Sequence, residues 1–126
     1  MEVLEERIRQ KHAIRENYAK RLGHMFEFMP MAPFGRPNCW LTAGLLRESR
    51  LMPMDVVNAL EKENIESRPV WKPMHLQPVF SDTAYFTAEN NVDVSASLFA
   101  RGVCLPSDTK MTSDQMDRVV RVCESL

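Results

Sequence analysis

The distribution of proline constrains the fold of this chain more than any other feature of its sequence. Seven of the eight prolines lie between residues 30 and 78 of the 126. Proline fixes φ and has no N–H to donate, so it is confined to turns, to the first turn of a helix and to the edges of sheets. The middle of the chain is therefore expected to consist of ordered turns and short extended segments.

A helix is predicted at each end of the chain. The first occupies residues 1–22, where i,i+4 pairs of Glu with Arg or Lys accompany an apolar stripe, and Gly23 follows as a helix stop. The second follows Thr112, which forms a capping box with Gln115 ahead of apolar residues at i, i+3, i+4 and i+7. The stripe of the first helix contains Leu4, Ile8, Ile14, Tyr18 and Leu22.

Between these two helices the predicted elements are short. The apolar run at residues 39–46 predicts a central strand buried on both faces, and residues 52–64 predict a helix with Pro53 in its first turn. Extended segments are expected at 24–30, 65–70 and 103–106, loops at 31–38 and 81–91, and a short helix at 93–102. Short strands joined by helices predict an α+β fold, in which helices pack on a small, mainly antiparallel sheet. Residues 1–126 are the size of one domain.

Composition excludes several classes of partner. The formal net charge is −1, and the basic residues of the first helix alternate with Glu, so no nucleic-acid partner is expected. No apolar run approaches the roughly 20 residues needed to span a bilayer, and the charged N-terminus does not resemble a signal peptide. Cys39, Cys104 and Cys123 form no CxxC pair, which argues against a zinc site or a disulfide framework. These features favour a cytoplasmic protein with buried thiols.

Signatures of catalysis are missing from the sequence. His12, His24 and His75 are far apart and show no metal-binding spacing, and there is no Gly-rich phosphate loop. Most carboxylates lie on predicted helices beside Lys or Arg, which is typical of a solvated face. We therefore predict no catalytic and no metal-ligating residue in this chain.

The segment "SRPVWKPMH" (residues 67–75) is the first candidate binding site. A proline follows both Arg68 and Lys72, which biases both residues toward an extended backbone and stiffens the segment. Arg68 could bind a phosphate through two hydrogen bonds, Lys72 could supply a point charge, and His75 could donate to an anionic oxygen. Trp71 offers a flat face for a ring. The alternative is a stiff connection with a packed Trp71 and solvated charges.

A weaker candidate is "FGRPNCW", residues 34–40. Gly35 would allow close approach of the backbone, Arg36 is a cation, and Asn38 can both donate and accept hydrogen bonds. A turn that leads into the next strand explains the same residues.

The order of motifs along the chain resembles one enzyme family. "RPVWKPMHLQPVF", followed by "LFARGVCLPSDTKMTSDQMDRVV", is similar to the C-terminal part of the DegT/StrS sugar-nucleotide aminotransferases. The long helix "EERIRQKHAIRENYAKRL" and the segment "GRPNCWLTAGLL" precede them in the same order. The resemblance covers essentially all of the sequence. The "WKPMH" motif is most similar to members that aminate 4-keto-6-deoxy sugars linked to UDP, as in bacillosamine-type pathways.

The resemblance implies the small, C-terminal domain of a fold type I enzyme that uses pyridoxal phosphate (PLP) and glutamate as the amino donor. In such enzymes the lysine that forms the Schiff base lies in a large N-terminal domain. The five lysines here lie in no segment of that kind: Lys11, Lys20, Lys62, Lys72 and Lys110. We therefore expect the chain to bind no PLP alone, to be inactive alone, and to connect to the large domain through its first helix.

The resemblance also implies a partner and a site. A nucleotide-linked sugar would bind at His75 first, then at Arg68, Trp71 and Lys72, with Arg36 and Asn38 as a second tier. A homodimer or other self-association is expected through the uncovered side of the first helix, at Leu4, Ile8 and Tyr18. The alternative function is a free-standing module that binds a nucleotide sugar or a protein without catalysis.

Overall fold

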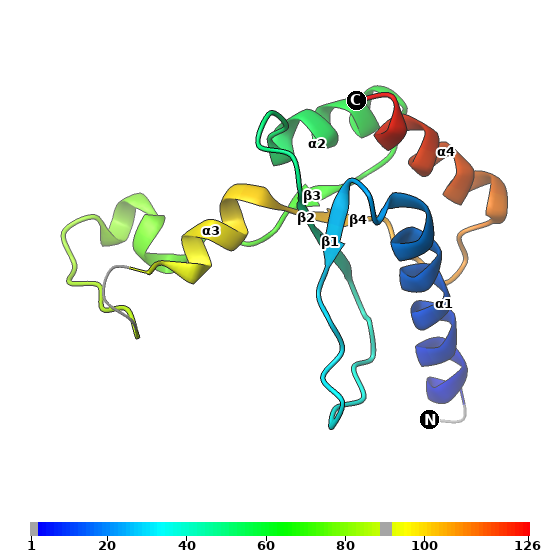
Figure 1. Ribbon diagram of the computed structural model, residues 1–126, viewed down its shortest axis with the longest axis horizontal. Coiled ribbons are helices and arrows are strands. Elements are labelled where there is room, and N and C mark those ends of the chain that lie inside the picture. Colours follow the sequence, from blue (N-terminus) through cyan, green and yellow to red (C-terminus); the bar gives the residue numbers. More distant parts are fainter. Residues whose placement is uncertain (1–2, 89–91) are drawn as a thin grey trace.

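The computed structural model describes residues 3–88 and 92–126. Within these ranges the fold is the expected α+β arrangement of helices on a small antiparallel sheet (Figure 1). The α-helices are α1 (Leu4–Leu22), α2 (Pro53–Lys62), α3 (Val94–Arg101) and α4 (Ser113–Glu124). The strands are β1 (Phe26–Phe28), β2 (Thr42–Leu46), β3 (Arg68–Pro69) and β4 (Gly102–Leu105). Two 3-10 turns, η1 (Met74–Leu76) and η2 (Pro78–Phe80), follow β3.

The strands form one sheet in the order β1-β2-β4-β3, and every neighbouring pair is antiparallel. The central pair aligns Thr42 with Leu105 and Gly44 with Val103. Residues paired in this way point to the same face of an antiparallel sheet. Alternate residues of each strand therefore point to opposite faces of the sheet. One face is buried in the core, and the other is called the second face here.

The core lies between the buried face and three helices. Buried residues of α1, α2 and α4 pack with buried residues of β1, β2 and β4 in a single cluster. The largest fully buried side chains include Tyr18, Phe26, Leu22, Leu46 and Leu60. Tyr18 also donates a hydrogen bond from its hydroxyl to the Pro106 carbonyl, 2.9 Å away. Self-association through Tyr18 was therefore a wrong expectation, because the core of the chain itself covers this side chain.

The second face of the sheet is only partly covered, by α3, which lies on the far side from α1 and α4 in Figure 1. The strand at residues 39–46 was expected to be buried on both faces. It begins at Thr42 instead, and its burial alternates, with Thr42, Gly44 and Leu46 buried and the intervening residues half-exposed. It starts late because Cys39 has a positive φ of 49°, which breaks the extended backbone.

Residues 71–88 and α3 together form an extension, here called the arm, which projects from the sheet (Figure 1). The strand expected at 65–70 is reduced to Arg68 and Pro69, because proline cannot donate to a strand ladder. The loop expected at 81–91 begins after η2, and residues 89–91 of it lie outside the described ranges.

The remaining expectations concern the cysteines and the membrane. Cys39 and Cys123 are buried and Cys104 is half-exposed, and all three are free thiols. Burial raises the pKa of Cys123 to about 12, and it also raises the pKa of Cys39 and Cys104. In the described part of the chain, the helices lack the length and apolar character that crossing a bilayer would require.

Candidate functional site

A cavity of about 970 Å³ lies beside the edge strand β3, and it is called the polar cavity here for the charged side chains in its wall. Arg68, Trp71 and Lys72 line it, so the structure brings together three of the predicted site residues. Arg68 pairs with Cys104 in the register of β3 and β4, which puts both on the second face of the sheet. The indole of Trp71 is not packed in the core, since 69% of the residue is exposed. A flat aromatic face is thus available at the mouth of this cavity.

Positive charge predominates among the groups that line the polar cavity. Its four cations are Arg68, Lys72, Lys110 and Arg118, and its carboxylates are Glu66 and Asp108. The guanidinium of Arg68 pairs with Glu66, and that of Arg118 donates to the Glu63 carbonyl 2.7 Å away. Among the described residues, no carboxylate is in an ion pair with Lys72 or Lys110. Two ammonium groups are therefore available to bind an anion.

An apolar groove of about 690 Å³ lies on the other side of the same segment. Its floor is the second face of β2, at Ala43 and Leu45. Trp71 and Lys72 line this groove as well as the polar cavity, and α3 contributes Leu98. The segment from Trp71 to Lys72 is thus a shared wall between a charged space and an apolar one.

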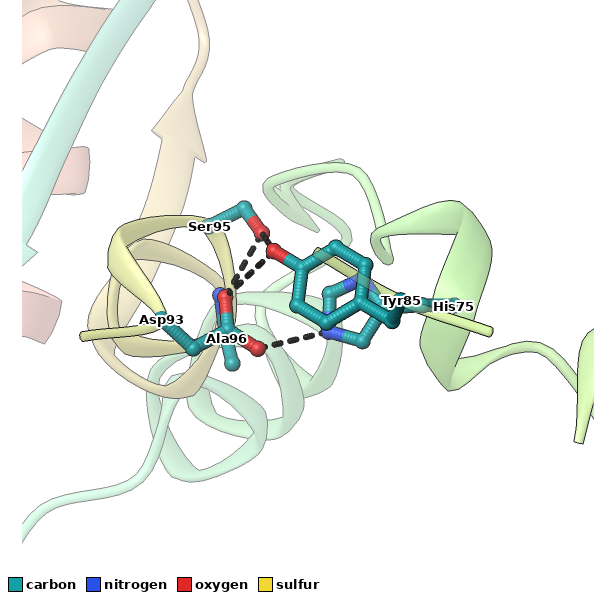
Figure 2. Close-up of polar contacts among 5 residues, drawn as sticks. All are labelled: His75, Tyr85, Asp93, Ser95 and Ala96. Carbon is teal, nitrogen blue, oxygen red and sulfur yellow. Dashed lines mark hydrogen bonds and ion pairs between the residues drawn. The ribbon is translucent and has the colours of Figure 1, made fainter. Parts of the chain in front are cut away.

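His75 lines neither cavity. It lies in η1, where its side chain is 14% exposed and its Nε2 is 2.6 Å from Asp93 Oδ2 (Figure 2). Tyr85 stacks on its ring, with 3.6 Å between the centroids and 11° between the planes. The first candidate binding residue, His75, is therefore held by Tyr85 of the arm and by Asp93, which precedes α3.

Asp93 receives hydrogen bonds from several donors at once. Its Oδ1 accepts from the Ala96 N–H at 2.9 Å, the Ser95 hydroxyl at 2.8 Å and the Tyr85 hydroxyl at 3.2 Å (Figure 2). The Ala96 N–H belongs to the first turn of α3, so Asp93 is the N-cap of that helix. The bond from this N–H, followed by those from Ser95, His75 and Tyr85, lowers the pKa of Asp93 to about 2 despite partial desolvation. The carboxylate is therefore ionised over the whole physiological pH range.

Arg36 and Asn38 lie away from both cavities, in the loop between β1 and β2. The guanidinium of Arg36 pairs with Glu5 of α1. The Asn38 Oδ1 accepts a hydrogen bond from the Trp40 N–H at 3.1 Å. Both side chains have structural contacts here, as the turn interpretation predicts, and the structure does not join them to Arg68, Trp71 and Lys72.

Four residues of this region were not predicted from the sequence. Lys110 and Arg118 belong to the β4–α4 connection and to α4, which are remote in sequence from β3. Tyr85 and Asp93 fall in or next to a loop without periodicity. A sequence signal did exist for Asp93, because Asp is a preferred N-cap and an apolar helical pattern follows it. No comparable signal marks Lys110, Arg118 or Tyr85.

Comparison with known proteins assigns the family. The sequence pattern of the DegT/DnrJ/EryC1/StrS aminotransferase family matches residues 1–124. The chain belongs to this family. As a DegT-family chain it is similar to EpsN from Bacillus subtilis (strain 168), for which a pyridoxal phosphate-dependent aminotransferase activity has been proposed. The two are 43% identical over 124 residues, which are 97% of this chain and 32% of EpsN.

Solved structures of DegT-family enzymes share the fold. A DegT DnrJ EryC1 StrS aminotransferase from Brucella abortus superposes with a TM-score of 0.80 at 22% identity, over 98% of this chain and 32% of that enzyme. DesI, solved in the presence of its TDP-sugar product, gives 0.80 at 18% identity, over 96% of this chain and 31% of DesI. The chain therefore spans about a third of the length of these DegT-family relatives.

The lysines of this chain do not fit a Schiff base with PLP. Such a lysine must lose its charge, which requires a desolvated pocket or a neighbouring cation. Lys20, Lys62, Lys72 and Lys110 are exposed, and the half-exposed Lys11 donates to the Ser107 carbonyl. No lysine in the sequence is buried. We therefore assign no step of PLP chemistry to residues of this chain.

Proposed function

We propose that this chain is the small domain of a PLP-dependent aminotransferase that aminates a keto group on a nucleotide-linked sugar. The observation that carries the proposal is the family match over residues 1–124, together with a cationic cavity beside an exposed tryptophan. The large domain would supply the lysine and most contacts with PLP, since no lysine here is suited to that role. This chain would bind and enclose the substrate.

The polar cavity provides groups for each part of a nucleotide-linked sugar. The diphosphate would bind at the ammonium groups of Lys72 and Lys110, which are free of ion pairs with the described carboxylates. A nucleobase would stack on Trp71, since every base presents a π-face to an aromatic ring. Arg68 would have to leave Glu66 to bind a phosphate, which makes it a secondary contact. The site would thus bind the diphosphate more through lysine than through arginine.

The finer assignments belong to the same proposal. The "WKPMH" motif supports a UDP-linked 4-keto-6-deoxy sugar as the substrate, and the family supports glutamate as the amino donor. DesI, with its TDP-sugar product, supports the nucleotide-linked class more generally. EpsN supports PLP as the cofactor of the complete enzyme.

Calorimetric titration of the chain with UDP tests the proposal. We expect measurable binding that Trp71→Ala and Lys110→Ala each weaken about tenfold or more, since each removes a stacking or charge contact. Lys20→Ala is a matched control, because it removes an exposed ammonium that does not line the polar cavity. No binding by the native chain, or equal loss in all three variants, would contradict this site.

A non-catalytic binding module is the second candidate. The ammonium groups unpaired with any described carboxylate and the exposed Trp71 at the polar cavity favour binding of an anion by this chain itself. Adding PLP to the chain and reducing with borohydride should label no single lysine under either proposal. A stable adduct at one lysine would show that the chain forms the Schiff base itself, which would contradict both.

A further inference from the structure

The contact between His75 and Asp93 joins the two sides of the apolar groove. One side is the segment that carries Trp71 and Lys72, which continues through Met74 into η1 and His75. The opposite side is α3, which begins directly after Asp93. A hydrogen bond of 2.6 Å across this gap fixes the distance between the two sides at one end of the groove.

The chemistry of Asp93 decides which nitrogen of His75 carries the hydrogen. The carboxylate has no hydrogen to give, and donors already surround its Oδ1. Its Oδ2 can therefore only accept, which requires Nε2 of His75 to donate. In the neutral ring, Nδ1 then holds the lone pair and cannot donate to a phosphate. His75 thus donates to an anionic oxygen, as the sequence suggested it could, but this oxygen belongs to Asp93 and not to a phosphate.

We propose that Asp93 is a positioning residue of the candidate site, which holds His75 as the Nε2–H tautomer and thereby fixes the segment that carries Trp71 and Lys72. Tyr85 completes the arrangement, since its ring covers one face of the imidazole and its hydroxyl also reaches Asp93. His75 then acts on the substrate through the position of this segment. The role of this segment in binding rests on the proposed function, whereas the pair of His75 and Asp93 is defined without a ligand.

Asp93→Asn is the variant that isolates the pair. Asn caps a helix about as well as Asp, so its Oδ1 can still accept from the Ala96 N–H. The amide NH2 then replaces Oδ2 opposite His75 and can only donate. The tautomer of His75 should therefore change from Nε2–H to Nδ1–H, whereas a purely structural cap would leave the tautomer unchanged.

The readout is the ¹H–¹⁵N spectrum of the imidazoles, recorded at a pH above which the ring signals no longer change. His12 is an internal reference, since its Nε2 is 2.6 Å from the Pro37 carbonyl and should stay protonated in every variant. Ser95→Ala is the matched control, because it removes a donor to Oδ1 and leaves the contact with His75 in place. An Nδ1–H tautomer in the native chain, or no change in Asp93→Asn, would overturn the proposal.

Hydrogen exchange tests whether the pair fixes the segment. The Leu76 and Gln77 amides donate to Pro73 and Met74 at 3.1 and 3.0 Å, next to His75. They should exchange about tenfold faster in Asp93→Asn and at the native rate in Ser95→Ala. Unchanged rates in Asp93→Asn would overturn the positioning role. Neither readout needs a ligand, so failure of UDP to bind would contradict the proposed function alone.

Discussion

Tyr18 shows how one polar atom is accommodated in the core. Its side chain is fully buried, and its hydroxyl donates to the Pro106 carbonyl in the β4–α4 connection. Burial also raises the pKa of this phenol, so the hydroxyl remains a protonated donor at neutral pH. This hydrogen bond and that of Lys11 with the Ser107 carbonyl tie α1 to a loop that lines the polar cavity.

Tyr18→Phe should lower the free energy of unfolding by about 1–2 kcal/mol, because the Pro106 carbonyl loses its partner in a buried position. Urea denaturation followed by circular dichroism measures this change. Tyr85→Phe is the comparison, since Tyr85 is half-exposed and water can replace its hydroxyl. An equal decrease in the free energy of unfolding in the two variants would show that burial of the Tyr18 hydroxyl does not determine the size of the decrease.

Asp93 should make stability depend on pH in the acid range. Its pKa is lowered from 3.8 to about 2 in the folded chain, so folding favours the ionised form. The stabilisation is complete above the unfolded pKa and is lost as the pH falls toward 2. Urea titrations at pH 6 and pH 2.5 should therefore give a large difference between the native chain and Asp93→Asn at pH 6 and a smaller one at pH 2.5. A constant difference would contradict this assignment.

The sequence predicted which residues line the polar cavity better than it predicted the contacts that each residue makes. The prolines of "SRPVWKPMH" correctly indicated an extended start, and Arg68, Trp71 and Lys72 do line one cavity. The contacts of His75 could not be predicted from the sequence. Its partners lie 10 and 18 residues further along the chain, in a region without periodicity, so nothing in the sequence links them to it.

At the scale of elements, the helices were predicted closely and the strands less so. The capping box of Thr112 and Gln115 is present, and α4 begins at Ser113 as expected. Strand lengths depend on partners that the local sequence does not contain, and β3 is limited to two residues by its proline and its place at the edge. Gly23 follows α1 as predicted, but with a φ of −63°. It is required because a Cβ would lie only 2.4 Å from the Ala19 carbonyl oxygen.

Gly102→Ala should destabilise the junction of α3 and β4. A Cβ at this position would lie 2.5 Å from Val70 Cγ2 and 2.7 Å from the Leu98 carbonyl oxygen, and the backbone atom cannot move aside. Overpacking of this kind costs about 1–3 kcal/mol, measurable as a lower denaturation midpoint. Gly35→Ala is the matched control, since its nearest neighbour would be at 3.7 Å. A Gly102→Ala midpoint as high as that of Gly35→Ala would contradict this packing.

At the scale of the whole molecule, large apolar side chains are exposed in the loop between β1 and β2. Phe34 is 94% exposed and Met29 is 75% exposed, whereas the exposed large apolar residue of α1 is Leu4 in its first turn. Exposed apolar groups favour association. This loop is therefore better suited to self-association than the side of α1 that contains Tyr18.

The chain should self-associate at high concentration, and Phe34→Ser should reduce the association. Light scattering over a concentration series measures the change in mean mass. Met54→Ser is the control, because Met54 is an exposed apolar residue on α2, away from the loop. A monomer at every concentration, or an equal effect of the two substitutions, would contradict this role of the loop.

The loop between β1 and β2 runs beside α1 in Figure 1, and three polar contacts join the two. Arg36 pairs with Glu5, His12 contacts the Pro37 carbonyl, and Arg15 donates to the Met29 carbonyl. We therefore expect α1 and this loop to move together as one rigid body. The 19 residues of α1 span about 28 Å, so a rotation of about 10° at the sheet would carry the far end about 5 Å. A small rotation of α1 at the sheet would thus produce a large displacement of Phe34.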